Sequence, residues 1–116
     1  MRMKQGEYTA ACARMLTGLG YQDADVKTDE VLCAADAEGT RVCVRCVLTG
    51  WIRVGELEVE EMLPLMRYYG ADAGLILTNG RFTRGAVRRA KEEGCITLKP
   101  RFRPHADREE DTAALL

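Results

Sequence analysis

Residues 73–98 read AGLILTNGRFTRGAVRRAKEEGCITL and carry the densest set of boundary signals in the chain. The apolar run at 75–77 stops at an Asn-Gly pair, as expected for a strand that helices cover on both faces. Thr83 can cap the helix that follows, and Gly94 lies where a left-handed residue ends such a helix. Residues 95–98 then form a second short strand. This order predicts two parallel neighbouring strands joined by a right-handed crossover.

Two further helices are expected before this unit. Apolar residues recur at helical spacing in 7–19 and again in 59–69, and a glycine follows each segment. The first segment predicts an amphipathic helix that packs on the sheet. Pro64 lies inside the second and removes a backbone N–H, so the regular helix should begin near Glu61 or bend at this point.

The clearest strand is 41–48, because apolar side chains alternate along it. Its second face presents Arg45 on an otherwise apolar surface. We expect a carboxylate of the neighbouring hairpin to pair with Arg45, since an unpaired guanidinium on a covered face is costly. Two shorter strand-like pieces, 26–28 and 31–34, precede this strand, with turn composition at 37–40. Together the elements predict an α/β fold with a mixed sheet of about five strands and helices on both faces.

Length and composition bound the class of protein. At 116 residues the chain is expected to be one domain, residues 1–99, followed by a C-terminal tail, residues 100–116. Five cysteines are an odd number, no apolar leader opens the sequence, and no apolar run approaches the ~18 residues of a membrane helix. We therefore expect a soluble cytoplasmic protein with free thiols. The net charge of −1 neither favours nor excludes an anionic partner.

Positive charge is concentrated near the C-terminal end. Residues 81–103 contain eight Lys or Arg and two Glu. On the predicted helix, Arg84, Arg88 and Lys91 share one face, and Arg81 lies just before it. This row and the positive end of the helix could hold phosphates. Alternatively, the row is a solvated helix face that the two glutamates partly neutralise, and both interpretations stay open.

Cysteine and histidine suggest no chemistry. Cys43 and Cys46 match a C-x-x-C pattern, but residues three apart on a strand face opposite sides, so buried structural thiols are expected. His105 is the single histidine and lies in the tail. A solvated side chain is expected there, which leaves no histidine-based nucleophile to propose.

The short sequence motifs at the ends of these elements resemble those of a known family. The most specific is Leu77-Thr-Asn-Gly-Arg-Phe-Thr83, followed by Ala86 and Ala90, which is similar to a strand, a T-x-G-x-F-T turn and an alanine-marked helix. Val44-Arg-Cys-Val47 stands where the family has V-Q-C-K. Over about residues 5–98 the chain thus resembles the catalytic domain of Mrr-type restriction endonucleases, of the PD-(D/E)xK nuclease superfamily. The resemblance implies a restriction-endonuclease-like architecture.

The resemblance also implies where the chemistry of the family would lie. In that family a glutamate of the first helix, an aspartate after a hairpin and a Glu/Gln-x-Lys pair hold Mg²⁺ and activate water. The corresponding residues of this chain are Thr9, Val31, Arg45 and Val47. None of them can hold Mg²⁺ or activate water as the family residues do, since Mg²⁺ needs carboxylate oxygens. The acids that relocation could have recruited are Asp29, Glu30 and Asp36.

The sequence therefore favours a catalytically degenerate domain that acts as a DNA-associated or protein-interaction module, without a cofactor. A first alternative is a metal-dependent DNA endonuclease with a rearranged site, which would use Mg²⁺. A second is a structural dimerisation unit that binds no nucleic acid. The expected partners are double-stranded DNA, bound by Arg81, Arg84, Arg88 and Lys91, and a second copy of the chain, with no membrane contact. The homodimer is expected because a monomer need not bury Trp51, Tyr68, Tyr69 and Phe102.

Overall fold

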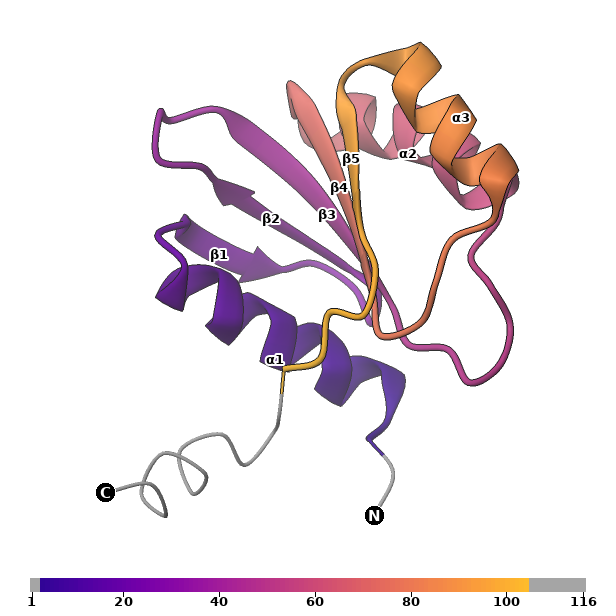
Figure 1. Ribbon diagram of the computed structural model, residues 1–116. Helices are drawn as coiled ribbons and strands as arrows, with labels where there is room; N and C mark the ends of the chain where they lie inside the picture. Colours follow the sequence, from indigo (N-terminus) through magenta and orange to yellow (C-terminus); the bar gives the residue numbers. More distant parts are fainter. Residues whose placement is uncertain (1–2, 105–116) are drawn as a thin grey trace.

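The computed structural model describes residues 3–104 and has an α/β architecture (Figure 1). Its one sheet has the strand order β1-β2-β3-β4-β5. The strands are β1 (Gln22–Val26), β2 (Val31–Ala35), β3 (Arg41–Val47), β4 (Ala73–Thr78) and β5 (Ile96–Lys99). The helices of the described residues are α1 (Gln5–Gly18), α2 (Glu56–Tyr69) and α3 (Arg84–Glu93). β1, β2 and β3 pair antiparallel, whereas β3, β4 and β5 pair parallel, which confirms the predicted mixed sheet.

Helices cover both faces of the sheet, as expected. α1 packs on one face, where Tyr8 and Leu16 belong to a buried cluster with residues of β2, β3 and β4. α2 and α3 share the other face, where Met62 and Ala90 belong to a second cluster. Figure 1 shows α1 on the side of the sheet away from α2 and α3. Among residues 3–104, no helix is long and apolar enough to cross a membrane.

The central strands are apolar because helices cover both faces of the sheet. In β3, Val44 points into the cluster beneath α1 and Cys43 into the cluster beneath α2. The same division holds in β4, where Leu75 and Ile76 belong to opposite clusters. A strand with two covered faces buries consecutive residues, so β4 has a continuous apolar run rather than an alternating one.

The unit of β4, α3 and β5 matches the prediction. Thr83 caps α3, because its Oγ1 accepts a hydrogen bond from the Ala86 N–H at 3.1 Å. The helix ends at Gly94, whose φ of 77° is left-handed. Since β3, β4 and β5 are parallel, their carboxyl ends meet at one edge of the sheet. Open α/β sheets commonly bind ligands at that edge.

The first strand differs from the prediction. β1 covers Gln22–Val26 and not 26–28. The Thr28 hydroxyl accepts hydrogen bonds from the N–H groups of Glu30 and Val31, which turns the chain there instead of extending it. β1 is an edge strand with mostly exposed side chains, so no apolar alternation marks it in the sequence.

The start of α2 differs from the first of the two expected alternatives, a helix that begins near Glu61. α2 begins at Glu56 and continues through Pro64 to Tyr69. The Glu58 carboxylate accepts a hydrogen bond from the Gly55 N–H at 3.0 Å and thereby holds the first turn. Burial of side chains before and after the proline offsets the one backbone hydrogen bond that Pro64 cannot make.

The segment after β5 stays on the domain, so the expectation that the chain leaves the fold there is wrong for residues 99–104. The Phe102 N–H donates to the Thr78 carbonyl at 2.8 Å, and the Tyr8 hydroxyl donates to the Phe102 carbonyl at 2.6 Å. The Phe102 ring packs against the cluster beneath α1. His105 and the rest of the expected tail, residues 106–116, lie outside the described residues.

Candidate functional site

The four positions at which the family resemblance places catalysis gather at one end of the sheet. Val31 at the start of β2 is the direct cross-strand partner of Arg45 in β3. Val47 follows on the same side of β3 as Arg45. Thr9 of α1 reaches the chain just before β2, because its hydroxyl donates to the Asp29 carbonyl. The structure therefore brings together the residues that the sequence comparison singled out.

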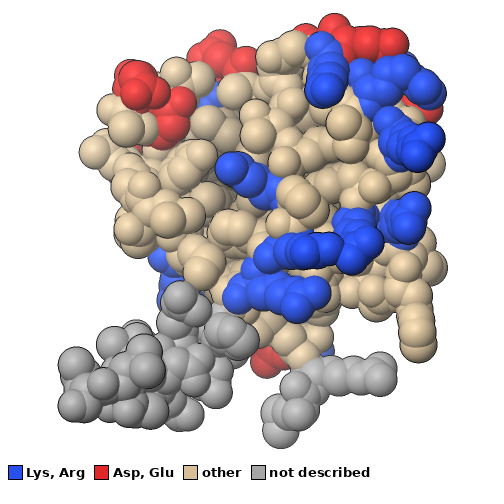
Figure 2. Space-filling model, in the orientation of Figure 1, with Lys and Arg blue, Asp and Glu red and all other residues tan. Residues whose placement is uncertain are grey.

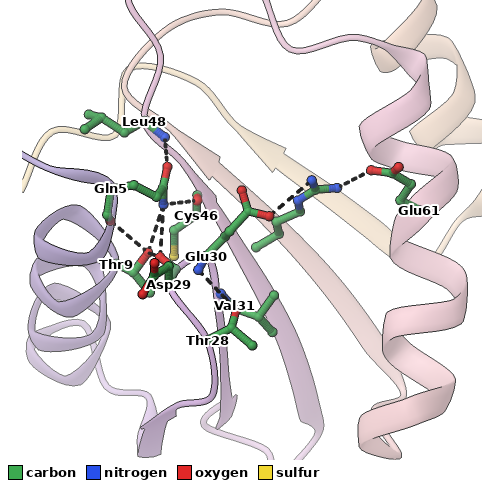
Figure 3. Close-up of polar contacts among 10 residues, drawn as sticks. Gln5, Thr9, Thr28, Asp29, Glu30, Val31, Cys46, Leu48 and Glu61 are labelled. Carbon is green, nitrogen blue, oxygen red and sulfur yellow. Dashed lines mark hydrogen bonds and ion pairs between the residues drawn. The ribbon is translucent and has the colours of Figure 1, made fainter.

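Arg45 lies between two carboxylates. Its Nη1 is 2.7 Å from Glu61 Oε1 in α2, and its Nη2 is 3.4 Å from Glu30 Oε1 in the chain before β2. Figure 3 shows Glu30 and Glu61 approaching the guanidinium from opposite sides. The Arg45 side chain is 15% exposed, and its Nε is buried without a hydrogen-bond partner in the described residues. The predicted pairing of Arg45 with a hairpin carboxylate is confirmed for Glu30.

Neutral groups fill the adjoining part of the site. The Gln5 side chain spans it, since Nε2 donates to the Cys46 carbonyl at 2.7 Å and Oε1 accepts from the Leu48 N–H at 3.0 Å. The same Nε2 lies 3.0 Å from Thr9 Oγ1 and 3.2 Å from the Asp29 carbonyl (Figure 3). These bonds tie the first turn of α1 to the end of β3. Thr9 and its surroundings thus form a hydrogen-bonded joint that contains no side-chain carboxylate.

The acids considered for a relocated site go to different places. Glu30 pairs with Arg45, whereas the Asp29 side chain is exposed and only its carbonyl takes part in the joint. Asp36 shapes the hairpin turn, because its Oδ1 accepts from the N–H groups of Glu38 and Thr40 at 2.9 and 2.8 Å. Within residues 3–104, no three His, Cys, Asp or Glu side chains are placed to hold a metal ion.

The residues at this end of the sheet do not fit Mg²⁺. A hard divalent cation takes oxygen ligands, mostly carboxylates and water. Val31 is 4% exposed and packs in the cluster beneath α2, with Val47 against it. Between these apolar groups the cationic Arg45 already occupies the space between Glu30 and Glu61. Its positive charge opposes the binding of a second cation there.

Two residues of the site were not anticipated from the sequence. Glu61 contacts Arg45 from a helix that follows β3 by a long loop, and no local pattern indicates such a contact. Gln5 carried a weak signal, because it lies four residues before Thr9 and therefore on the same helix face. Its other bonds join residues 24, 41 and 43 positions apart, which the sequence alone does not indicate.

The cysteines lie where the sequence predicted. Cys46 belongs to the cluster beneath α1 and Cys43 to the cluster beneath α2, so the C-x-x-C pair faces opposite sides of the sheet. All five cysteines are free. Burial raises the pKa of the Cys43 thiol to about 12, and a hydrogen bond with Cys12, together with burial, raises the pKa of Cys46. Neither group is a reactive thiolate at neutral pH.

One surface of the domain carries lysine and arginine side chains that are all exposed, and we call it the basic face. Its members are Arg81, Arg84, Arg88, Lys91, Lys99, Arg101 and Arg103. Figure 2 shows lysine and arginine gathered over α3 and around the carboxyl ends of β4 and β5. The Arg101 N–H donates to the Gly80 carbonyl at 2.9 Å, which holds the last part of this face against the turn before α3. No ion pair within residues 3–104 involves a member of the basic face.

Arg89 is the cation of α3 that the basic face does not include. Its Nε is 2.9 Å from Glu93, and its Nη1 is 3.1 Å from Glu60 and 4.0 Å from Glu56 of α2. The hydrogen bond to Glu93 is the main cause that raises the pKa of the Arg89 guanidinium. Arg89 therefore joins α3 to α2, while the other cations of the helix face solvent on the side away from Ala86 and Ala90.

A comparison of the chain with known protein families identifies its family. A family model described as restriction endonuclease, Mrr_cat, matches residues 1–101. The chain belongs to this family of Mrr-type restriction endonuclease domains. The resemblance inferred from the sequence motifs is thus confirmed. No curated protein sequence matches the chain.

Several solved structures share the fold. A protein of unknown function, AF1548, superposes with a TM-score of 0.72 at 19% identity, over 88% of this chain and 61% of that one. A repair endonuclease from Pyrococcus abyssi gives 0.61 at 16% identity, over 90% of this chain and 49% of that one. EndoMS in complex with dsDNA gives 0.60 at 17% identity, over 90% and 48%. At these identities the likeness establishes the fold, and the chain spans about half the length of both nucleases.

We predict that Arg45→Leu leaves the free energy of unfolding within about 1 kcal/mol of the wild-type value, or raises it slightly. The change removes an Nε that is buried without a hydrogen-bond partner among residues 3–104. Glu30 and Glu61 remain solvated without Arg45, because their side chains are 46% and 48% exposed. Urea unfolding followed by circular dichroism measures the difference.

Glu30→Gln combined with Glu61→Gln is the matched control. It leaves the mostly buried guanidinium without a carboxylate and should lower the free energy of unfolding by about 1–3 kcal/mol. Loss of folding in Arg45→Leu, together with an unaffected double glutamine variant, would contradict the interpretation of this cluster as an ion pair of modest strength.

Proposed function

We propose that this domain is a non-catalytic member of the restriction endonuclease family that associates with double-stranded DNA in the cytoplasm. One observation carries the non-catalytic part. Arg45, with Glu30 and Glu61, forms an ion pair where the family resemblance places the metal site. Metal-assisted hydrolysis needs a cation that binds the scissile phosphate and lowers the pKa of a water molecule. A guanidinium can bind a phosphate but cannot generate that nucleophile.

The basic face supports the DNA-associated part. Its side chains extend from α3 across the turn at 79–83 to the segment after β5, at the edge where three parallel strands end. Nonspecific DNA binding requires an exposed surface of lysine and arginine that neutralises several phosphates. A restriction-endonuclease-like structure, EndoMS, has been solved with dsDNA, which is consistent with a DNA partner for this fold.

A face of α2 supports a second function, self-association. Leu57, Pro64 and Tyr68 are separated by seven and four residues and so lie along one side of the helix. All three are exposed, Leu57 to 61% and Tyr68 to 80%. We propose that a second copy covers this face in a homodimer. Of the other aromatic residues expected at such an interface, Tyr69 and Phe102 pack against the two cores instead.

The purified protein should not cut plasmid DNA in Mg²⁺ or Mn²⁺. Loss of one catalytic group typically lowers a rate by orders of magnitude, and here none of the four family positions carries an acid or a lysine. Nicking of methylated and unmethylated supercoiled plasmid, followed on agarose gels, measures this directly. The expected rate is indistinguishable from that of buffer alone.

The control for this assay is chosen from the carboxylates that the structure brings together. Glu30→Gln and, separately, Glu61→Gln remove the two acids that pair with Arg45. Asp29→Asn, added to Glu30→Gln, removes the neighbouring exposed acid, and the Asp36 turn stays intact. Metal-dependent nicking by the wild type that disappears in these variants would establish the rearranged endonuclease. Nicking that persists in all of them would come from a contaminating nuclease.

DNA binding should be weak, independent of sequence and steeply dependent on salt, with Kd of about 10⁻⁴–10⁻⁶ M near physiological ionic strength. Arg84→Glu with Arg88→Glu should abolish it, because each change replaces a cation of the basic face by an anion. Fluorescence anisotropy of a labelled duplex across a salt series measures both effects.

Arg14→Glu with Arg67→Glu is the matched control, because it makes the same change in net charge at exposed positions of α1 and α2. This variant should bind almost as well as the wild type. Equal loss of binding in both double variants would show that net charge, and not the basic face, controls the affinity. Absence of binding by the wild type at low salt would leave the dimerisation unit as the better interpretation.

The homodimer should be visible by light scattering at high micromolar concentration. Tyr68→Glu should shift the mass toward the monomer, because it buries a charge in the proposed interface. Lys27→Glu, at an exposed site near β1, is a control that should leave the mass unchanged. A monomeric wild type at that concentration would remove this proposal.

A further inference from the structure

The loop between β3 and α2 presents the single tryptophan of the chain. Trp51 is 99% exposed, and its neighbour Ile52 is 77% exposed. An isolated exposed apolar residue is common on protein surfaces. Here, however, Trp51 stands at the wall of a groove of about 670 Å³, which is within the usual range of ligand sites. Neither the ion pair of Arg45 nor the α3 surface uses this groove.

The loop is held in place at its base. The Thr49 N–H donates to Asn79 Oδ1 at 2.8 Å, and the Thr49 hydroxyl donates to the Ile52 carbonyl at 2.7 Å. The Val54 N–H then donates to the Arg81 carbonyl at 2.8 Å. Both ends of the loop are therefore fixed to the turn before α3. This turn contributes Arg81 to the basic face. A fixed scaffold lowers the entropic cost when Trp51 contacts a ligand.

The groove combines an apolar floor with a cationic margin. Tyr8 and Leu48 form part of the floor, with Trp51 as a wall, and Asn79 and Arg103 supply polar groups. Asn79 Oδ1 already accepts from Thr49, so its amide NH₂ is the part of the side chain that can donate to a ligand. An aromatic wall, a hydrogen-bonding amide and adjacent arginines suit a flat heteroaromatic ring attached to a phosphate chain.

One exposed arginine lines this groove, and two others lie in the loop of Trp51 and in the turn bonded to that loop. Arg53 follows Trp51 in the loop, Arg81 lies in the turn to which the loop is bonded, and Arg103 lines the groove itself. Figure 2 shows positive side chains gathered in the lower half of the visible face. The charge complements a polyanion rather than a second copy of a chain whose net charge is close to zero.

We propose that this groove binds an unpaired nucleobase, stacked on the indole of Trp51, while the basic face holds the adjoining phosphates. The inference rests on the proposed DNA association and adds a preference to it. Within an intact duplex both faces of each base are covered by its neighbours, so an indole can stack only on a base that is unpaired or extruded. Extrusion costs least at a mismatched, bulged or single-stranded position. The protein should therefore prefer DNA that contains such a position.

The single tryptophan provides a direct measurement. The emission of Trp51 should be quenched when the wild type is saturated with a duplex that carries one bulged base, and much less by the same duplex without the bulge. By anisotropy, Trp51→Ala should weaken binding to the bulged duplex by about 5- to 150-fold, the range for loss of one stacked base. Its affinity for the perfect duplex should change less than twofold. Trp51→Phe should restore part of the preference for the bulge.

The outcomes separate this inference from the proposed function. If the wild type and Trp51→Ala bind bulged and perfect duplexes equally, and Trp51 emission stays constant at saturation, the groove is not a base site although DNA association stands. Absence of any DNA binding at low salt overturns both. If Trp51→Ala instead converts a dimer to a monomer by light scattering without DNA, a second copy occupies the groove and the inference fails.

Discussion

The parallel pairing of β3 with β4 places the features of functional interest at one end of the molecule. Val47 pairs with Thr78 where both strands end, so the loops that follow them are neighbours and meet in the bridge between Val54 and Phe82. β5 is parallel to β4 and brings the segment after it to the same edge. The Arg45 cluster, the groove beside Trp51 and the basic face all depend on this one arrangement of strands.

At that edge, the carboxylates of α2 are neutralised by arginines of the chain itself. Glu61 pairs with Arg45 of β3, while Glu56 and Glu60 lie near Arg89 of α3. These two guanidiniums thus offset part of the negative charge of an acidic helix. Because these pairs are partly exposed, each contributes little to stability. Their consequence is electrostatic, since a guanidinium lies between two carboxylates at the place where the family resemblance puts a divalent ion.

Local signals explain why part of this structure was predictable. The unit of β4, α3 and β5 is marked by an apolar run, a capping threonine and a terminal glycine, all of which act within a few residues. A carboxylate of the neighbouring hairpin was anticipated as a partner of Arg45 because adjacent strands lie close, and Glu30 is the one that pairs with it. Glu61 and Gln5 were not anticipated, since their contacts join a helix to a distant strand end. β1 was misplaced because an exposed edge strand needs no apolar alternation.

The residues that would cut DNA and those proposed to hold it lie on different elements, which makes the two properties separable. The family resemblance places catalysis at the ends of β2 and β3 and on α1, at the positions of Val31, Arg45 and Thr9. The basic face depends on α3 and the turn before it, whose fold is fixed by Thr83, Ala86 and Ala90. Residues of the first set can therefore change without disturbing the helix that presents the cations. A domain of this kind can lose hydrolysis and keep an electrostatic surface, because the packing of the shared sheet requires neither.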